Sequence, residues 1–219
     1  MGENMIKIEK LSKEFKEREL FTDVSFQITK GEICGIIGKN GVGKSVLMKM
    51  IAGIMYPTRG TIIIDGVMLK EGSFPEGVGI VLDNIGFLKE YNGYKNLKLI
   101  ASILNQISDE RIKECMQCVG LNPDDRTKVG KYSLGMRQKL ALAQAIMEHP
   151  EILLLDEPFN GLDEESVRSI RELLIQINEE EKTTILIISH DKEDLMSFCN
   201  RIIKIENKNL KVVNLKNHY

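Results

Sequence analysis

Apolar residues alternate along the chain between two patterns, one typical of strands and one typical of helices. Short uninterrupted apolar runs such as Ile152–Leu155 suit strands that are buried on both faces of a parallel sheet. Between such runs, apolar residues recur every three or four positions, as they do on one face of a helix. The segment after Asp163 shows this stripe in Val167, Ile170, Leu174 and Ile177. The alternation predicts an α/β domain.

The order of the predicted elements divides the chain into three parts. Strands dominate the first third, helices follow one another between about residues 90 and 135, and strands alternate with helices after that. We expect a single domain over residues 1–219, a helical subdomain inserted at approximately residues 84–135, and a solvated end beyond about residue 205. The expected strands are Met5–Ile8, Val24–Ile28, Ile33–Ile37, Ile62–Ile64, Val78–Leu82, Ile152–Leu155 and Thr184–Ile188. The expected helices are Ser45–Ala52, Asn96–Asn105, Asp109–Val119, Leu134–Glu148, Glu164–Asn178 and Asp191–Asn200.

Composition and charge narrow the classes of function. The 219 residues include 30 basic and 32 acidic side chains, which gives a formal net charge of −2. A nucleic-acid-binding protein normally carries a strongly basic surface, so we expect no nucleic-acid partner. The apolar runs fall far short of the roughly 18–20 residues that a membrane span requires, and the first residues lack the apolar core of a signal peptide. These features predict a soluble, unexported chain.

The four cysteines do not suggest a disulfide framework at this length. Cys115 and Cys118 have a C-x-x-C spacing that can hold zinc, but a structural zinc site needs a second pair of ligands. Both lie in a segment with helical periodicity, where cysteine packs as a small apolar residue. We therefore expect no metal at this pair.

Residues 38–45 read GKNGVGKS and match the phosphate-binding motif G-x-x-x-x-G-K-[ST] in full. A predicted strand precedes the motif and a predicted helix follows it, which is the context that the motif requires. Its glycines let main-chain N–H groups surround phosphate oxygens, and the helix N-terminus adds a partial positive charge. Lys44 would bind the β- and γ-phosphates, and the Ser45 hydroxyl would bind Mg²⁺.

Two acidic residues, Asp156 and Glu157, follow the apolar run Ile152–Leu155. A carboxylate at the end of a buried strand is costly unless a cation offsets its charge, so Asp156 is a candidate Mg²⁺ ligand together with Ser45. Glu157, one position further, would point in another direction and could accept a proton from an attacking water. Together with the phosphate loop, this pair predicts a P-loop nucleotide-binding protein.

Three further motifs distinguish among P-loop families. Residues 132–138 read YSLGMRQ and precede a long helical pattern, residues 160–163 read NGLD, and Ser189 and His190 end a later apolar strand. With these motifs in this order, the chain from about residue 5 to 205 resembles the nucleotide-binding domain of an ATP-binding-cassette (ABC) ATPase. The resemblance implies an α/β P-loop NTPase fold with a RecA-like core, an N-terminal antiparallel β subdomain and a helical insertion. It also implies hydrolysis of ATP with Mg²⁺, coupled to transport.

The resemblance implies roles for individual residues within one chain. Phe15 occupies the position of the aromatic residue that stacks on adenine, where the family usually has Tyr. Glu157 matches the general base, and His190 matches the histidine that senses the γ-phosphate. The residues expected to bind ATP from within the chain are Phe15, Gly38, Lys39, Asn40, Gly41, Val42, Gly43, Lys44, Ser45 and Val46.

Other residues match positions that act across a dimer in this family. Ser133 and Gly135 match the signature motif, which binds the γ-phosphate of the nucleotide held by the opposite subunit. Asp163 matches the loop that crosses to the partner subunit. The resemblance therefore implies a dimer, of this chain with itself or with a homologous ATPase subunit.

The sequence departs from the common family pattern in three places. The signature reads Ser-Leu-Gly-Met, so Leu134 and Met136 replace a glycine and a polar side chain. Val46 stands where a second hydroxyl is frequent, although its main-chain N–H can still bind phosphate. Asp83 replaces the glutamine that usually contacts Mg²⁺ and the attacking water, and it is a further candidate metal ligand.

Three features of the chain resemble the ATPase subunits of bacterial bacitracin- and lantibiotic-type exporters. They are the acidic residue at position 83, the Ser-Leu-Gly-Met signature and the stretch Gly86–Leu97. This resemblance implies a separate polytopic membrane permease, and export as the direction of transport. The chain would then be cytoplasmic and peripheral at the inner face of the cell membrane.

The permease is expected to dock near residues 74–94. In ABC ATPases this region receives the coupling helix of the membrane subunit, and four of the 12 aromatic residues fall in it. Aromatic residues are enriched in interface cores, but they also fill the core of a small helical subdomain, and the sequence does not decide between the two. The four residues are Phe74, Phe87, Tyr91 and Tyr94.

Two other functions fit part of the sequence. A soluble ABC-type ATPase with a regulatory or other non-transport role would share the nucleotide motifs, but such chains usually carry two cassettes or a coiled-coil insertion. A nucleotide-binding module that does not hydrolyse ATP would be expected to lack Glu157 or His190, and both are present.

Overall fold

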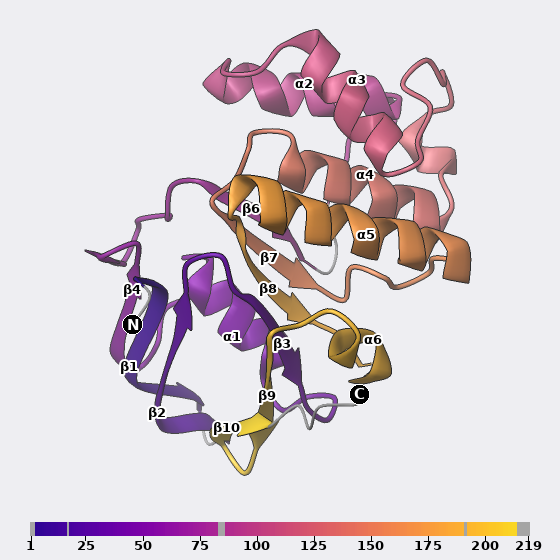
Figure 1. Cartoon of the computed structure of the whole chain (residues 1–219). Helices are drawn as coiled ribbons and strands as arrows, with labels where there is room; N and C mark the ends of the chain where they lie inside the picture. Colours follow the sequence, from indigo (N-terminus) through magenta and orange to yellow (C-terminus); the bar gives the residue numbers. More distant parts are fainter. Residues whose placement is uncertain (1–2, 17, 83–85, 191, 214–219) are drawn as a thin grey trace.

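Two β-sheets of different kinds organise the chain (Figure 1). The structure is a computed structural model that describes residues 3–16, 18–82, 86–190 and 192–213. The first sheet has the strand order β2-β1-β4-β5 and is antiparallel; the second has the order β10-β9-β3-β8-β7-β6 and is mixed. The strands are β1 (Asn4–Phe15), β2 (Arg18–Thr29), β3 (Ile33–Ile37), β4 (Arg59–Ile64), β5 (Val67–Met68), β6 (Val78–Val81), β7 (Ile152–Asp156), β8 (Thr184–Ile188), β9 (Arg201–Glu206) and β10 (Asn209–Val213).

Five of the six expected helices agree closely with the periodic segments of the sequence, whereas the last, α6, covers only Lys192–Met196 of the expected Asp191–Asn200. Asn92, Ser108, Ser133 and Asp163 each precede a helix and accept a hydrogen bond from a main-chain N–H of its first turn. Such caps satisfy donors that the helix itself leaves unpaired. The helices are α1 (Lys44–Ile51), α2 (Gly93–Leu104), α3 (Asp109–Cys118), the 3₁₀ turn η1 (Val129–Lys131), α4 (Leu134–Ile146), α5 (Glu164–Glu181) and α6 (Lys192–Met196).

The second sheet forms the centre of the molecule. Every residue of β7 and β8 is buried, as the uninterrupted apolar runs predicted. Because successive side chains point to opposite faces, Ile152 and Leu154 pack with α1 and the first sheet, whereas Leu153 and Leu155 pack with the helices on the other side. Figure 1 shows α4 and α5 covering that second face. The predicted α/β class, with an N-terminal antiparallel sheet, is confirmed.

Strand order brings the sequence motifs to one edge. Strands β3, β8 and β7 are neighbours and run parallel, so their carboxyl ends meet. The loops after them begin at Gly38, Ser189 and Glu157. Open α/β sheets bind ligands outside the carboxyl ends of their strands, so a ligand site is expected at this edge.

Helices α2 and α3 stand at one end of the molecule, beyond α4 (Figure 1). Leu97 of α2 and Ile112 and Cys115 of α3 are buried in the same core cluster as residues of α4. Cys118 is exposed, whereas burial raises the pKa of the Cys115 thiol to about 11. The two cysteines therefore lie in different environments.

Beyond residue 205 the chain forms a hairpin that the sequence did not predict, and Lys208 and Lys211 on it are exposed, as expected of a solvated end. Strand β10 pairs antiparallel with β9 through a tight turn in which Asn207 and Lys208 have φ values of 50° and 62°. This is the backbone of a two-residue hairpin turn, which is usually signalled by a glycine that the sequence lacks here. The Lys208 ammonium donates a hydrogen bond to Glu19 of β2 at 2.9 Å, which ties the hairpin to the first sheet.

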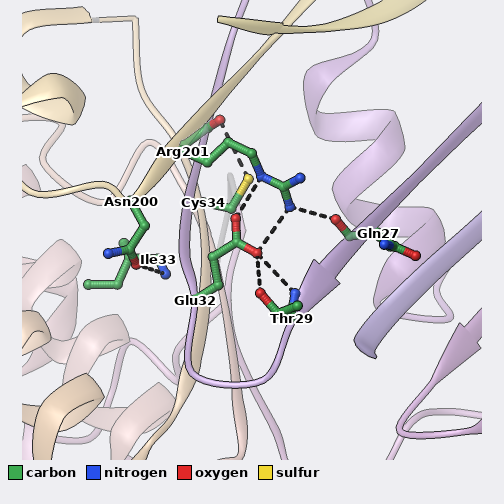
Figure 2. A network of polar contacts seen from close by, with 8 residues as sticks. Gln27, Thr29, Glu32, Ile33, Cys34, Asn200 and Arg201 are labelled. Atoms are coloured by element: carbon green, nitrogen blue, oxygen red, sulfur yellow. Dashed lines mark hydrogen bonds and ion pairs between the residues drawn. The ribbon is translucent and has the colours of Figure 1, made fainter. Parts of the chain in front are cut away.

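A polar network fixes the start of β3 against the start of β9 (Figure 2). The Arg201 guanidinium donates to both carboxylate oxygens of Glu32, at 2.7 and 3.0 Å, and to the carbonyl of Gln27. The same carboxylate accepts the main-chain N–H and the hydroxyl of Thr29. Bidentate arginine–carboxylate pairs hold a defined geometry. The network therefore fixes the end of β2, in the first sheet, against the starts of β3 and β9 in the second sheet.

Candidate nucleotide-binding site

A cleft of about 510 Å³ opens at the carboxyl edge of the second sheet. It brings together parts of the phosphate loop, the two acidic residues at the end of β7 and the aromatic residue at the end of β1. Its lining residues are Phe15, Arg18, Leu20, Asn40, Gly41, Gly43, Lys44, Ser45, Val46, Asp156 and Glu157.

The first turn of α1 is open to an anion. Gly43 precedes the helix with a φ of 112°, a conformation that suits glycine, and α1 has no side-chain cap. A Cβ at this position would lie 2.7 Å from the Phe21 ring. The unpaired N–H groups and the positive end of the helix dipole therefore face the cleft without a competing side chain, as a phosphate site requires.

The Lys44 side chain is buried within the loop that precedes its helix. Its ammonium donates hydrogen bonds to the carbonyls of Gly38 at 2.8 Å and Lys39 at 3.4 Å. The Lys39 carbonyl also accepts the N–H of Val42 at 3.3 Å. These bonds hold the positive charge in the bend of the loop, where phosphate oxygens would meet it.

The donor set at the bottom of the cleft fits Mg²⁺. Asp156 ends β7 and is 4% exposed, and the Ser45 hydroxyl lines the same cleft from α1. Mg²⁺ prefers oxygen ligands and is usually held by one or two carboxylates together with substrate phosphates. Among the described residues no group of three His, Cys, Asp or Glu side chains could hold a metal by itself. Asp83, the third predicted ligand, lies outside the described residues.

Glu157 and His190 are in direct contact. A Glu157 carboxylate oxygen lies 2.9 Å from Nδ1 of the His190 ring and accepts the His190 main-chain N–H at 3.2 Å. Glu157 has a φ of 52°, which is unusual for a residue with a side chain and costs about 1–3 kcal/mol. Asp156 and Glu157 both line the cleft.

Phe15 lines the cleft with 42% of its surface exposed, and the Lys13 ammonium lies 4.9 Å from the centre of its ring. Sequence reasoning missed Arg18, which lines the cleft beside it and donates a hydrogen bond to the Gly41 carbonyl at 2.7 Å. No motif signals Arg18, because only the pairing of β1 and β2 brings it to the phosphate loop.

The signature residues lie elsewhere. Ser133 caps α4 by accepting the Met136 N–H at 3.1 Å, and a Cβ at Gly135 would lie 2.7 Å from the Gly161 carbonyl. Neither Ser133 nor Gly135 is among the described residues that line the cleft. The signature therefore packs against residues 160–163 of its own chain rather than against its own phosphate loop.

Asp163 caps α5 in the same way. Its carboxylate accepts the Ser166 N–H at 2.8 Å, and this hydrogen bond holds the pKa of Asp163 below its usual value. Gln138, for which the sequence motifs predict no role, donates from its amide to the Glu157 carbonyl at 3.2 Å. Helix α4 thus touches the end of β7 near the predicted base.

The four aromatic residues of the predicted docking region divide into two pairs. Phe87 and Tyr94 are partly buried and pack against the core, whereas Phe74 and Tyr91 are exposed. Buried Asn96 holds the segment before α2, because its side chain accepts the Leu88 N–H at 2.8 Å and donates to the Leu88 carbonyl at 3.1 Å. Tyr91 is thereby presented on a fixed turn.

The profile of one protein family, described as ABC transporter, matches residues 21–160. The ABC transporter ATP-binding protein YybJ of Bacillus subtilis is 40% identical over 207 residues, which cover 94% of each chain. The bacitracin transport ATP-binding protein BcrA of Enterococcus faecalis is 37% identical over 190 residues, covering 86% of this chain and 62% of that protein. The lantibiotic transport ATP-binding protein SrtF of Streptococcus pyogenes is 34% identical, covering 85% of this chain and 80% of that protein.

A solved structure shares the fold. The ATP-binding cassette MJ0796, solved as a dimer in a post-hydrolysis state with ADP and Pi, superimposes with a TM-score of 0.87 at 24% identity. The match covers 97% of this chain and all of that chain. Within the described residues, no helix combines the length and the apolar character needed to cross a bilayer.

Proposed function

The chain belongs to the ABC transporter family as an ATP-binding subunit with ATPase activity, and from this premise we propose that it drives a separate membrane permease by ATP-dependent dimerisation. One observation carries the proposal. The signature residues Ser133 and Gly135 do not line the cleft that holds Lys44. One chain therefore offers two half-sites, and a second subunit would complete each of them.

Binding would provide the closing force. Main-chain N–H groups of residues 41–45 and the Lys44 ammonium would bind the phosphates of ATP, and Ser45 and Asp156 would hold Mg²⁺, which neutralises phosphate charge when bound. The Phe15 ring would stack on the base. The signature of the opposite subunit would then bind the γ-phosphate, so that two ATP molecules join the two subunits.

Hydrolysis would release the dimer. Glu157 would exchange its contact with His190 for the attacking water and take its proton, and His190 would contact the γ-phosphate. Loss of the γ-phosphate removes the contacts that favour the closed dimer, and the subunits separate. We assign to Asp83, the third candidate metal ligand, a contact with Mg²⁺ and the attacking water.

We assign approximately residues 84–135 to a helical subdomain, and we place the permease contact near residues 74–94, where the chain leads into that subdomain. The exposed Phe74 and Tyr91 support this placement, because large exposed apolar side chains are frequent at protein interfaces. The partner would be a polytopic permease, and the chain would lie at the inner face of the cell membrane through it.

Export of a peptide antibiotic or a similar compound is the transport function that the relatives favour, since BcrA and SrtF are named for bacitracin and lantibiotic transport. The test is co-expression of the chain with a candidate permease in a sensitive host. We expect the minimal inhibitory concentration of bacitracin or of a lantibiotic to rise at least fourfold, and the rise to vanish with Glu157→Gln. Unchanged sensitivity to both classes would reject this substrate class, and failure to co-purify with any permease would favour a non-transport ATPase.

A further inference from the structure

A second cavity, of about 620 Å³, lies between β6, the end of α2 and the end of α4. We call it the α4–β6 cavity. Gly79 of β6 lies against the end of α4. A Cβ there would lie only 2.0 Å from the Ala145 carbonyl, so β6 and α4 approach this closely only with glycine at this position. Its described lining residues are Pro75, Glu76, Gly77, Val78, Gly79, Ile80, Ile100, Leu104, Gln106, Gln144, Ala145, Met147, Glu148 and Pro150.

Two buried acceptor atoms of this cavity have no hydrogen-bond partner. They are Oε1 of Gln144 and Oε1 of Glu148, and no described residue donates to either of them. Gln144 lies in the last turn of α4 and Glu148 lies in the turn that follows the helix, and both residues line the cavity. Buried polar atoms are nearly always hydrogen-bonded in native proteins, and exceptions call for an explanation such as a missing binding partner.

Two basic side chains near the end of α4 are engaged by other groups. Arg111 of α3 donates to the carbonyls of Ile146 and Met147, at 3.2 and 3.3 Å, and His149 lies 3.3 Å from the Glu181 carboxylate. No Lys, Arg or His is among the cavity's described lining residues, whereas Glu148 and Glu76 are. Partial burial raises the pKa of Glu148.

We propose that the α4–β6 cavity binds one basic side chain, Arg or Lys, carried on an apolar cytoplasmic segment of the permease. The proposal rests on the proposed function and names the chemistry of that contact. Gln144 and Glu148 accept the N–H groups of the basic side chain, and the apolar residues Ile80, Ile100 and Leu104 contact its neighbours.

Charge complementarity favours this occupant over an uncharged one, because the described lining of the cavity carries Glu76 and Glu148 and no Lys, Arg or His. The short cytoplasmic loops of membrane proteins carry an excess of Lys and Arg, so a basic residue beside apolar ones is common in the segments that reach this surface.

The test is a selection with the full-length chain. A phage-displayed library of random 12-residue peptides is panned on the immobilised protein, with counter-selection on the double variant Gln144→Leu, Glu148→Gln. The affinities of enriched peptides are then measured by fluorescence anisotropy for the native chain, for Glu148→Gln and for Glu172→Gln, which changes an exposed acid on α5.

We expect enriched peptides to carry Arg or Lys between apolar residues. Glu148→Gln should weaken their binding at least about tenfold, as should replacement of the basic residue by Gln in the peptide, and Glu172→Gln should leave it unchanged. No enrichment, enrichment of uncharged peptides, or binding that is insensitive to Glu148 would each overturn the proposal. Self-association of the chain that Glu148→Gln abolishes would also overturn it, because the occupant would then be a second copy.

A stability measurement keeps the proposal testable without any peptide. Because the Glu148 carboxylate is desolvated and its buried oxygen is unpaired, Glu148→Gln should leave the melting temperature at pH 7.5 unchanged or raise it. A clear fall would show that the carboxylate stabilises the isolated chain, contrary to the proposal. ATP hydrolysis by the same preparations separates the two ideas, since failure of the ATPase reaction rejects the proposed function and leaves peptide binding to be judged by itself.

Discussion

The nucleotide cleft and the α4–β6 cavity are similar in size, but they offer opposite chemistry to a ligand. The cleft presents hydrogen-bond donors, namely the N–H groups at the uncapped start of α1 and the Lys44 ammonium, and it suits phosphate. The cavity presents unpaired acceptors on Gln144 and Glu148 within apolar walls, and it suits a cation. The nucleotide cleft therefore suits a freely diffusing anion, and the α4–β6 cavity suits a cationic side chain that belongs to another protein.

The two sites are connected by a single helix. Near its start, α4 donates from Gln138 to the carbonyl of Glu157, and at its end it carries Gln144 and leads to Glu148. Its 13 residues span about 20 Å. A rigid element that contacts both sites is the simplest physical route by which ATP binding at one site would change the other. The following predictions test each side of this comparison.

The largest effect is expected at the nucleotide cleft. Glu157→Gln keeps the size and hydrogen bonding of the side chain but removes its ability to accept a proton. We expect the rate of phosphate release to fall about 10²- to 10⁴-fold with little change in ATP affinity. A variant that hydrolyses ATP at the native rate would exclude Glu157 as the base, and Glu172→Gln is the matched control.

The next effect is on stability at the other site. Gly79→Ala places a Cβ against the Ala145 carbonyl, so β6 and α4 must separate, and we expect a loss of about 3 kcal/mol in the free energy of unfolding. Gly86→Ala is the matched control, because a Cβ at Gly86 meets nothing within 4 Å. Urea unfolding measures both variants. Equal stability of the two would mean that β6 and α4 are not held as close as described.

The third effect concerns the exposed turn before α2. We expect Tyr91 on this turn to affect the coupling of ATP hydrolysis to transport, but not hydrolysis itself. Tyr91→Ala removes a side chain that is 44% exposed, so we expect basal ATP hydrolysis within about twofold of native and transport to be lost with the permease present. Phe87→Ala should also uncouple transport, but with a lower melting temperature, because Phe87 packs against the core. Normal transport by both variants would remove this turn from the interface.

The smallest expected effects are opposite pH dependences. Glu148 has a raised pKa in the folded chain, so its carboxylate destabilises the fold above that pKa, and the cost disappears as the pH falls below the ordinary value of 4.5. The gain in melting temperature from Glu148→Gln should therefore be larger at pH 8 than at pH 4.

Asp163 has a lowered pKa, so its contribution to stability is present above the ordinary value of 3.8 and is lost as the pH falls through the folded-state pKa. Asp163→Asn should lower the melting temperature slightly at pH 7 and have no effect near pH 2. Melting curves between pH 2 and pH 8 measure both residues. Parallel curves for the two variants would contradict these assignments.

More of the nucleotide cleft than of the α4–β6 cavity could be predicted from the sequence. Residues 38–45 are contiguous and each position has a required chemistry, so the motif alone located the loop and its lysine. Gln144 and Glu148 carry no such signal, because they look like the polar end of an ordinary helix. Their shared position in a cavity is apparent only in the structure, where Gly79 lets β6 lie against α4. Arg18 was missed for the same reason, since strand pairing rather than local sequence places it at Gly41.

The apparent mass of Glu157→Gln in solution tests the central claim most directly. Sedimentation equilibrium with ATP and Mg²⁺ should give twice the 24.8 kDa of one chain, and it should give 24.8 kDa without nucleotide or when Lys44→Ala is added. A variant that binds ATP and remains at 24.8 kDa would contradict the claim that two subunits, each supplying half of both sites, complete the nucleotide site together.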